Sequence, residues 1–186
     1  INGKYTMYMV GRYIFLKLKI NDCNEKIKVL QIINIRDLKI IDLFAGVGGL
    51  TLGFEDAGFE SVASVDLWSD AIDTFNHNRE NKTGLNIDIK EFNEHILPKI
   101  LSNNLISGVI GGPPCQGFSS ARLSDRSERM IGINEDRNQL YLEFYKTVKI
   151  AQPDFFVLEN VRGMLNLSNG AFVKDILSRF GKLGYE

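Results

Sequence analysis

From Lys39 onward, short apolar segments typical of β-strands alternate with longer segments whose apolar residues recur at helical spacing. The expected strands are residues 40–44, 61–66, 86–89, 105–110 and 154–159; the expected helices run from the glycine turn 46–49 through about residue 57 and over residues 69–79, 93–101 and 139–151. Such alternation produces an α/β, Rossmann-like fold: a mostly parallel sheet with helices on both faces. Ligands of these sheets bind outside the carboxyl ends of the strands, so functional residues are expected there.

The first 38 residues do not follow this alternation. Two β-rich segments, residues 6–20 and 26–35, flank the turn-like sequence Asn-Asp-Cys-Asn at residues 21–24. We expect a hairpin or an added edge element here. The chain is therefore divided into an N-terminal β-rich extension, residues 1–38, and a main domain, residues 39–186.

Composition is that of a globular domain. The chain has 186 residues, of which 44% are apolar and 24% charged, enough for one domain with its own core. No apolar run approaches the roughly 20 residues needed to cross a bilayer, and no signal-peptide pattern opens the chain. The net charge of −1 excludes a uniformly basic nucleic-acid-binding protein, so DNA binding would rest on a local patch or on parts outside this chain.

Cysteine and histidine usage points to a reducing compartment without a metal site. Cys23 and Cys115 are too few for a disulfide framework. Cys23 lies in the predicted turn, where a turn or packing role is favoured over a nucleophilic one. His77 and His95 lack a cysteine or a second histidine at metal-ligand spacing, so we predict that no metal is bound.

Residues 42–50, Asp-Leu-Phe-Ala-Gly-Val-Gly-Gly-Leu, predict a strand, a glycine turn and the start of a helix. Glycines let the backbone pass close to a ligand, and the amides of a helix N-terminus favour a negative group. The spacing lacks the full G-x-G-x-x-G fingerprint, so a tight turn without a ligand is the alternative for this segment alone. Asp66 ends the next strand about 20 residues further on, where an acidic residue can hydrogen-bond a ribose diol.

A thiol and a carboxylate follow two further predicted strands. Cys115 lies in the loop Gly-Gly-Pro-Pro-Cys-Gln-Gly-Phe-Ser, residues 111–119, and Glu159 ends the apolar segment 155–158. The two prolines before Cys115 restrict the backbone that leads into the loop. Brought to one edge of a sheet, the two groups can attack and polarise one small ring. For a cysteine considered alone, burial as a small apolar side chain would be the favoured interpretation.

The glycine turn, the Pro-Pro-Cys-Gln loop and Glu-Asn-Val at residues 159–161 together resemble the motifs of the DNA cytosine-C5 methyltransferases, over about residues 39–185. The resemblance implies a Rossmann-like S-adenosylmethionine-dependent methyltransferase fold, truncated at its C-terminus. It also implies S-adenosyl-L-methionine as the cofactor. Two small departures are Asp66, where the family commonly has Glu, and Ser107, where it often has Asp.

By this resemblance, the first motif holds the methionine part of the cofactor and Asp66 the ribose. Leu67 would lie on the adenine face, Trp68 would help to wall the pocket, and Asp88 would accept from the adenine amino group. The implied cofactor-binding residues are Asp42, Phe44, Ala45, Gly46, Gly48, Gly49, Leu50, Asp66, Leu67, Asp88, Ile89, Pro113 and Leu140.

The resemblance also implies covalent catalysis. The Cys115 thiolate would add to C6 of cytosine and make C5 nucleophilic, while Glu159 would hydrogen-bond N3 and the N4 amino group. Gln116 and Arg137 match further positions of the family's catalytic region, and Ser119, Arg122 and Arg162 match candidate DNA contacts.

The target base must be flipped out of the duplex before a thiol can reach C6. The segment 118–137 is too long to be a passive connection, and its serines and arginines can contact phosphates. A solvated charged loop is the alternative for any single arginine.

The chain ends before the family's Gln-x-Arg-x-Arg motif, its target-recognition domain and its closing helix. Three hypotheses follow. The first is the catalytic portion of a methyltransferase of double-stranded DNA, working in the bacterial cytoplasm as part of a restriction-modification system, with the recognition half on a longer chain or a second polypeptide. The second is an inactive module that binds the cofactor or a partner, and the third is the same chemistry on RNA. No membrane partner is expected.

Overall fold

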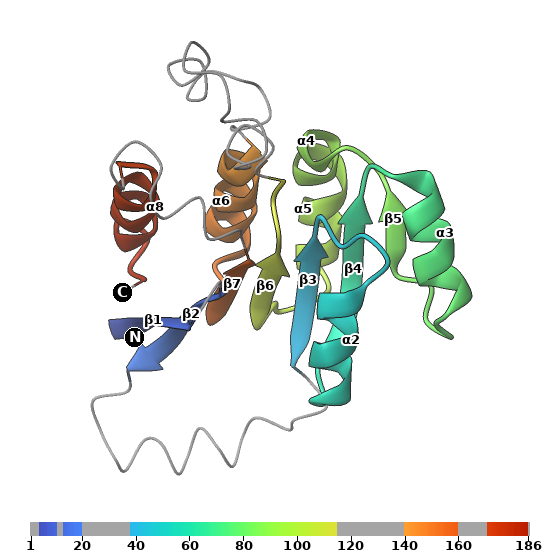
Figure 1. The fold of residues 1–186 in the computed structure, drawn as a ribbon, viewed down its shortest axis with the longest axis horizontal. Coiled ribbons are helices and arrows are strands. Elements are labelled where there is room, and N and C mark those ends of the chain that lie inside the picture. The colour runs from blue at the N-terminus through green and yellow to red at the C-terminus, as the bar shows by residue number, and fades with distance from the viewer. Residues whose placement is uncertain (1–3, 11–12, 20–37, 115–139, 160–170, 186) are drawn as a thin grey trace, which may run out of the picture.

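The computed structural model describes residues 4–10, 13–19, 38–114, 140–159 and 171–185, and its strands form one seven-stranded sheet in the order β1-β2-β7-β6-β3-β4-β5 (Figure 1). The strands are β1 Lys4–Val10, β2 Tyr13–Lys19, β3 Lys39–Leu43, β4 Glu60–Asp66, β5 Gly84–Asn86, β6 Gly108–Gly111 and β7 Phe155–Glu159. The five strands from β3 to β7 are parallel to one another, whereas β2 is antiparallel to both β1 and β7.

Helices connect the parallel strands. They are α2 Gly49–Asp56, α3 Ser69–His77, α4 Ile89–Glu91, the π-helical turn η2 Phe92–Ile96, α5 Leu97–Leu101, α6 Leu140–Ala151 and α8 Ala171–Gly181. α4, η2 and α5 follow one another without a break, and Pro98 lies in the first turn of α5. Proline is tolerated there because its missing N–H would have no partner within that helix.

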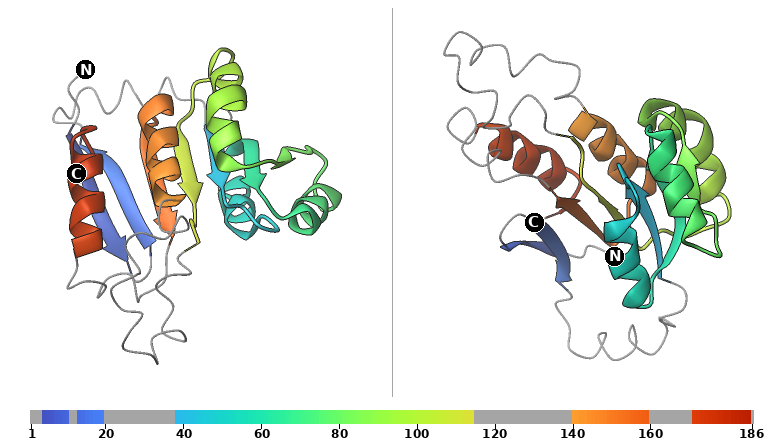
Figure 2. Two further views of the ribbon diagram at one scale, coloured as in Figure 1. Left: turned by 90° about the horizontal axis from the view of Figure 1, so that it is seen from above. Right: turned by 45° about the vertical axis from the view of Figure 1, so that its right-hand side comes forward.

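Two apolar clusters lie on opposite faces of the sheet. Neighbouring strand residues point to opposite faces, and Ile41 accordingly belongs to the larger cluster while Ile40 belongs to the smaller one. The larger cluster is completed by residues of η2, α5, α6 and α8, and the smaller one by Leu50 and Phe54 of α2. Figure 2 shows helices on both sides of the sheet. The fold predicted from the strand–helix alternation is thereby confirmed.

Helix α8, which the sequence pattern did not predict, packs on the larger cluster through aromatic rings. The ring centroids of Phe180 and Phe156 are 4.2 Å apart, and Tyr185 donates a hydrogen bond to the Pro153 carbonyl oxygen at 2.6 Å. The Tyr141 hydroxyl of α6 hydrogen-bonds the Asp175 carboxylate of α8. These contacts hold α8 against β7 and α6.

The third predicted strand, residues 86–89, is wrong in position. β5 ends at Asn86, which pairs with Asp66 of β4. Asp88 has already left the sheet, because its Oδ1 accepts the Lys90 N–H at 2.7 Å and so caps the helix that begins at Ile89. β6 likewise begins at Gly108 rather than at Leu105, whose side chain is 92% exposed.

The N-terminal hairpin also differs from the expectation. β1 and β2 pair from Lys4 with Lys19 to Val10 with Tyr13, so the hairpin lies within residues 4–19 and does not reverse at residues 21–24. Those residues, like the second predicted segment 26–35, lie outside the described residues. β2 pairs with β7, so the hairpin extends the sheet beyond the parallel strands. A domain boundary at residue 38 stays a prediction.

The fold can be tested at Gly111, where β6 lies close to the backbone of β3. A methyl group added at Gly111 would lie 2.1 Å from the Leu43 carbonyl oxygen, whereas one added at Gly53 of α2 would meet no atom within 4 Å. We predict that Gly111→Ala lowers the free energy of unfolding by about 2 kcal/mol or more, because backbone must move. Gly53→Ala should raise it by about 0.5–1 kcal/mol. Equilibrium urea denaturation measures both, and similar stabilities for the two variants would contradict the close approach.

Candidate active site

The parallel strands bring their carboxyl ends to one edge of the sheet. Leu43 of β3 pairs with Val65 of β4 and with Gly111 of β6, and Gly111 pairs with Leu158 of β7. The chain leaves β3 toward β4 and β5 and returns to β6 on the other side, which creates the topological switch point where α/β sheets bind ligands. Asp66 and Glu159 end their strands, and Asp88 and Gly112 follow within two residues of the ends of β5 and β6.

The glycine turn after β3 is fastened to the end of β4. Phe44 has a φ of 60° and Gly46 a φ of 54°. A positive φ at a phenylalanine costs on the order of 1–3 kcal/mol and persists only where neighbouring contacts enforce it. Here the Ala45 N–H donates to the Val65 carbonyl at 3.0 Å, and the Gly46 N–H donates to Asp66 Oδ2 at 2.8 Å. The Asp66 carboxylate thus sets the shape of the turn.

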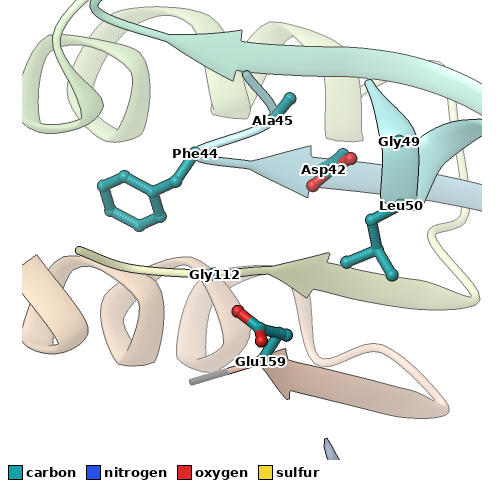
Figure 3. Close-up of a pocket in the computed structure, with 7 residues that line it drawn as sticks. All are labelled: Asp42, Phe44, Ala45, Gly49, Leu50, Gly112 and Glu159. Carbon is teal, nitrogen blue, oxygen red and sulfur yellow. The ribbon is translucent and has the colours of Figure 1, made fainter. Parts of the chain in front are cut away.

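A cavity of about 300 Å³, here called the Glu159 pocket, lies between the turn and the ends of β6 and β7. It is lined by Asp42, Phe44, Ala45, Gly49, Leu50, Gly112 and Glu159 (Figure 3). A methyl group added at Gly112 would lie 3.1 Å from Glu159 Oε2. The missing side chain at Gly112 therefore leaves room for the Glu159 carboxylate beside the end of β6.

A second cavity of about 400 Å³, here called the Asp88 pocket, lies on the other side of Phe44. It is lined by Phe44, Val65, Asp66, Leu67, Trp68, Ile87, Asp88, Ile89, Gly112, Pro114 and Leu140. Leu67 is 70% exposed and Trp68 is 64% exposed, so two large apolar side chains lie at its open side. Phe44 and Gly112 line both pockets, which therefore share a wall.

Asp42 is a buried carboxylate beneath the turn. Its Oδ2 accepts the Thr51 hydroxyl at 2.5 Å, and its Oδ1 is buried without a hydrogen-bond partner. Burial raises the pKa of Asp42 to about 7, although the hydrogen bonds from Thr51 and the charge of Arg79 oppose the shift. Thr51 also contacts Ser64 of β4 at 3.3 Å. A polar network thus crosses the otherwise apolar interior directly behind the Glu159 pocket.

The family model of the C-5 cytosine-specific DNA methylases matches residues 38–186. The chain belongs to this family.

Curated relatives of this methylase chain are type II methyltransferases of bacteria. It is 40% identical to M.FnuDI of Fusobacterium nucleatum over 80% of this chain and 39% of the relative, and 41% identical to M.NgoPII of Neisseria gonorrhoeae over 80% and 40%. A shorter relative, M.HgiGI of Herpetosiphon aurantiacus, is 46% identical over 67% of this chain and 90% of its own length. The chain thus spans about two fifths of the length of the first two relatives.

Solved structures agree with this assignment. The crystal structure of a prophage-encoded Escherichia coli protein, described as a DNA modification methyltransferase, aligns with a TM-score of 0.63 and 37% identity over 78% of this chain and 38% of that one. The Dnmt2 methyltransferase of Schizosaccharomyces pombe aligns with a TM-score of 0.52 and 19% identity over 76% and 40%, a likeness of fold.

Most cofactor-binding residues predicted for this methylase line one of the two pockets. Gly46 and Gly48 shape the turn instead, and Pro113 is buried while its neighbours Gly112 and Pro114 line the Asp88 pocket. Glu159 lines the Glu159 pocket. The remaining predicted catalytic and DNA-contacting residues lie outside the described residues: Cys115, Gln116, Ser119, Arg122, Arg137 and Arg162.

Sequence reasoning missed several residues of the candidate site. Val65 and Ile87 line the Asp88 pocket, and each is next to a predicted residue, so the strand positions alone could have indicated them. Thr51 lies nine positions after Asp42, on the helix that follows the strand of Asp42. This spacing is a weaker sequence signal. Arg79 carries no signal of this kind, because it follows the end of α3 and no predicted site residue is next to it in the sequence.

Among the described residues, no helix has the length and apolar character that a membrane span requires. Within the same residues, no three His, Cys, Asp or Glu side chains group as metal ligands would. The absence of a bound metal stays a prediction.

The buried carboxylate predicts a pH-dependent contribution to stability. Because its folded pKa of about 7 exceeds the unfolded value of 3.8, the folded chain binds this proton more tightly. The resulting stability is fully present below pH 3.8 and is lost as the pH rises through 7. We expect the free energy of unfolding of the wild type, relative to Asp42→Asn, to fall by a few kcal/mol, roughly 1.4 per unit of pKa shift, between pH 4 and pH 8. Urea denaturation of both proteins at several pH values measures this difference, and a constant difference would contradict it.

Proposed function

We propose that this chain carries the cofactor-binding and catalytic part of an enzyme that transfers a methyl group from S-adenosylmethionine to C5 of cytosine in double-stranded DNA. The observation that carries the proposal is the pair of adjoining pockets. One contains Asp66 and Asp88, the other contains Glu159, and Phe44 and Gly112 line both. A ligand that spans the shared wall would bring its far end beside the Glu159 carboxylate.

The residues of both pockets fit S-adenosylmethionine. The Asp88 pocket offers apolar walls for adenine and two carboxylates for its amino group and the ribose diol. The Asp66 oxygens each accept one backbone N–H, from Gly46 and Trp68, and each retains a lone pair for a hydroxyl. In the Glu159 pocket, the unpartnered Asp42 Oδ1 suits the ammonium of the methionine end. When bound, the cofactor supplies an electrophilic methyl group.

The chemistry on cytosine falls to Cys115 and Glu159. Cys115 directly follows Pro114, which lines the Asp88 pocket, so its position in the chain supports a role at this edge. Its thiolate sulfur forms a bond to C6, and the C5–C6 double-bond electrons make C5 nucleophilic. Glu159 hydrogen-bonds N3 and the N4 amino group and stabilises the charge that develops on the ring. Transfer of the methyl group to C5 would leave S-adenosylhomocysteine. Loss of the C5 proton to a base from the solvent, with breakage of the C6–S bond and return of its electrons to sulfur, would then release 5-methylcytosine and the thiolate.

Recognition of a DNA sequence requires contacts with base edges. We propose that residues outside this chain make them. The first relatives are about two and a half times as long as the part they share with this chain. We propose that the recognition half lies on a longer chain or a second polypeptide, and that the enzyme acts on DNA in the bacterial cytoplasm. The alternative function is a module that binds S-adenosylmethionine or a partner and transfers no methyl group.

Transfer of label tests the proposed reaction. The chain is incubated with methyl-labelled S-adenosylmethionine and unmethylated DNA, and label in 5-methylcytosine is counted beside a Cys115→Ala control. We expect incorporation by the wild type, and a loss in the variant of at least about 10³-fold, because a covalent nucleophile is removed. Equal incorporation by both proteins would contradict the nucleophile. Cofactor binding without transfer would fit either the inactive module or an enzyme that needs its recognition half, and adding a polypeptide that carries that half would separate the two.

The ribose contact is tested separately. Asp66→Ala should raise the dissociation constant for S-adenosylhomocysteine, because a charge-assisted hydrogen bond worth about 1.5–3 kcal/mol is lost. This corresponds to roughly 10-fold to 150-fold. Asp73→Ala, at an exposed position of α3, is the matched control and should leave the constant unchanged. Isothermal titration calorimetry measures both, and equal affinities would exclude the ribose contact.

A further inference from the structure

Arg79 contacts the glycine turn and the two helices beside it. Its Nη2 donates to the Gly48 carbonyl oxygen at 2.7 Å, and its Nε donates to Glu55 Oε2 at 3.0 Å. Its guanidinium carbon lies 3.8 Å above the centre of the Phe75 ring. Only 10% of the side chain is exposed. The guanidinium is therefore fixed by three different partners, which lie on α2, on α3 and in the turn.

The Phe75 ring and Arg79 together determine the position of Gly48. A methyl group on Gly48 would lie 2.4 Å from the Phe75 ring and 2.8 Å from Arg79 Nη1. Gly48 has a φ of 85°, which favours glycine, and its residue position is the N-cap of α2 without a side-chain cap. Its carbonyl accepts the Leu52 N–H at 3.0 Å as well as the Arg79 bond. Arg79 thus gives the carbonyl at the start of α2 a second donor and ties it to the segment that follows α3.

The positive charge of Arg79 lies at the N-terminus of α2, where a cation lowers the stability of a helix. A cation near a helix N-terminus opposes the helix dipole, typically by 0.3–1 kcal/mol. Glu55 compensates the charge but does not need the Gly48 contact to do so. The hydrogen bond to Gly48 therefore points to a task in the turn itself. Ala45, Gly49 and Leu50, on either side of Gly48, line the Glu159 pocket.

We propose that Arg79 is a positioning residue for the cofactor: by fixing the Gly48 carbonyl, it preforms the wall of the Glu159 pocket that receives the amino-acid end of S-adenosylmethionine. The inference rests on the proposed function. It concerns the half of the ligand in the Glu159 pocket, because Arg79 hydrogen-bonds Gly48, Glu55 and Phe75, none of which lines the Asp88 pocket.

Two ligands that share the adenosine half make the test specific. S-adenosylhomocysteine fills both halves, and 5′-methylthioadenosine lacks the amino-acid end. We expect Arg79→Gln to raise the dissociation constant of S-adenosylhomocysteine roughly 10-fold, as for loss of one charged hydrogen bond, and that of 5′-methylthioadenosine less than about 2-fold. Arg79→Lys retains the positive charge and can still donate a hydrogen bond, so it should restore part of the lost affinity for S-adenosylhomocysteine. It serves in place of Arg79→Gln if that variant does not fold.

Glu55→Gln is the matched control, because it removes the ion pair and leaves the Gly48 contact in place. It should change both dissociation constants less than about 2-fold. Thermal unfolding of each variant records any general loss of stability. An equal loss of affinity for both ligands, or no loss for either, would overturn the positioning role while the proposed function stands. Failure of the wild type to bind S-adenosylhomocysteine would overturn both.

Discussion

The candidate site depends on the parallel pairing of β3 with β4 on one side and β6 on the other. Because Leu43 is in register with Val65 and with Gly111, the segments that leave these strands emerge side by side. Gly111 permits this register, since any side chain there would overlap the Leu43 carbonyl. The turn, Asp66 and the Gly112–Pro114 segment then lie within reach of one ligand. None of them could do so if the central pairing shifted by one residue.

A second constraint is electrostatic. Asp42, Asp66 and Glu159 surround the same turn, and Asp42 is fully buried with one oxygen unpartnered. Burying such a group opposes folding unless it is protonated or meets a partner. The Thr51 hydroxyl and the charge of Arg79 offset part of this cost. A cationic ligand that binds beside Asp42 would supply the missing partner and offset part of the free-energy cost of burying this carboxylate.

The sequence allowed the central fold to be predicted because buried parallel strands are continuous apolar runs, as in residues 40–44 and 155–158. It also placed Asp66 and Glu159 correctly at strand ends. It failed for β5, a strand of three residues whose apolar signal continues into the helix capped by Asp88. It could not indicate Arg79 and indicated Thr51 only weakly, because their roles arise from contacts between elements that local periodicity does not reflect. Helix α8 is likewise held by tertiary aromatic contacts.

The wall shared by the two pockets has a consequence for competition inside a cell. Adenine nucleotides are abundant, and each carries the adenosine group that we propose binds in the Asp88 pocket. Their phosphates would extend across Phe44 and Gly112 toward the Glu159 carboxylate, with Asp66 and Asp88 already close to the sugar and base. Repulsion between these phosphates and the carboxylates disfavours binding of a nucleotide, whereas a ligand with a sulfonium and an ammonium is attracted. The same acidic groups that hold one ligand would thus keep the site clear of a far more plentiful one.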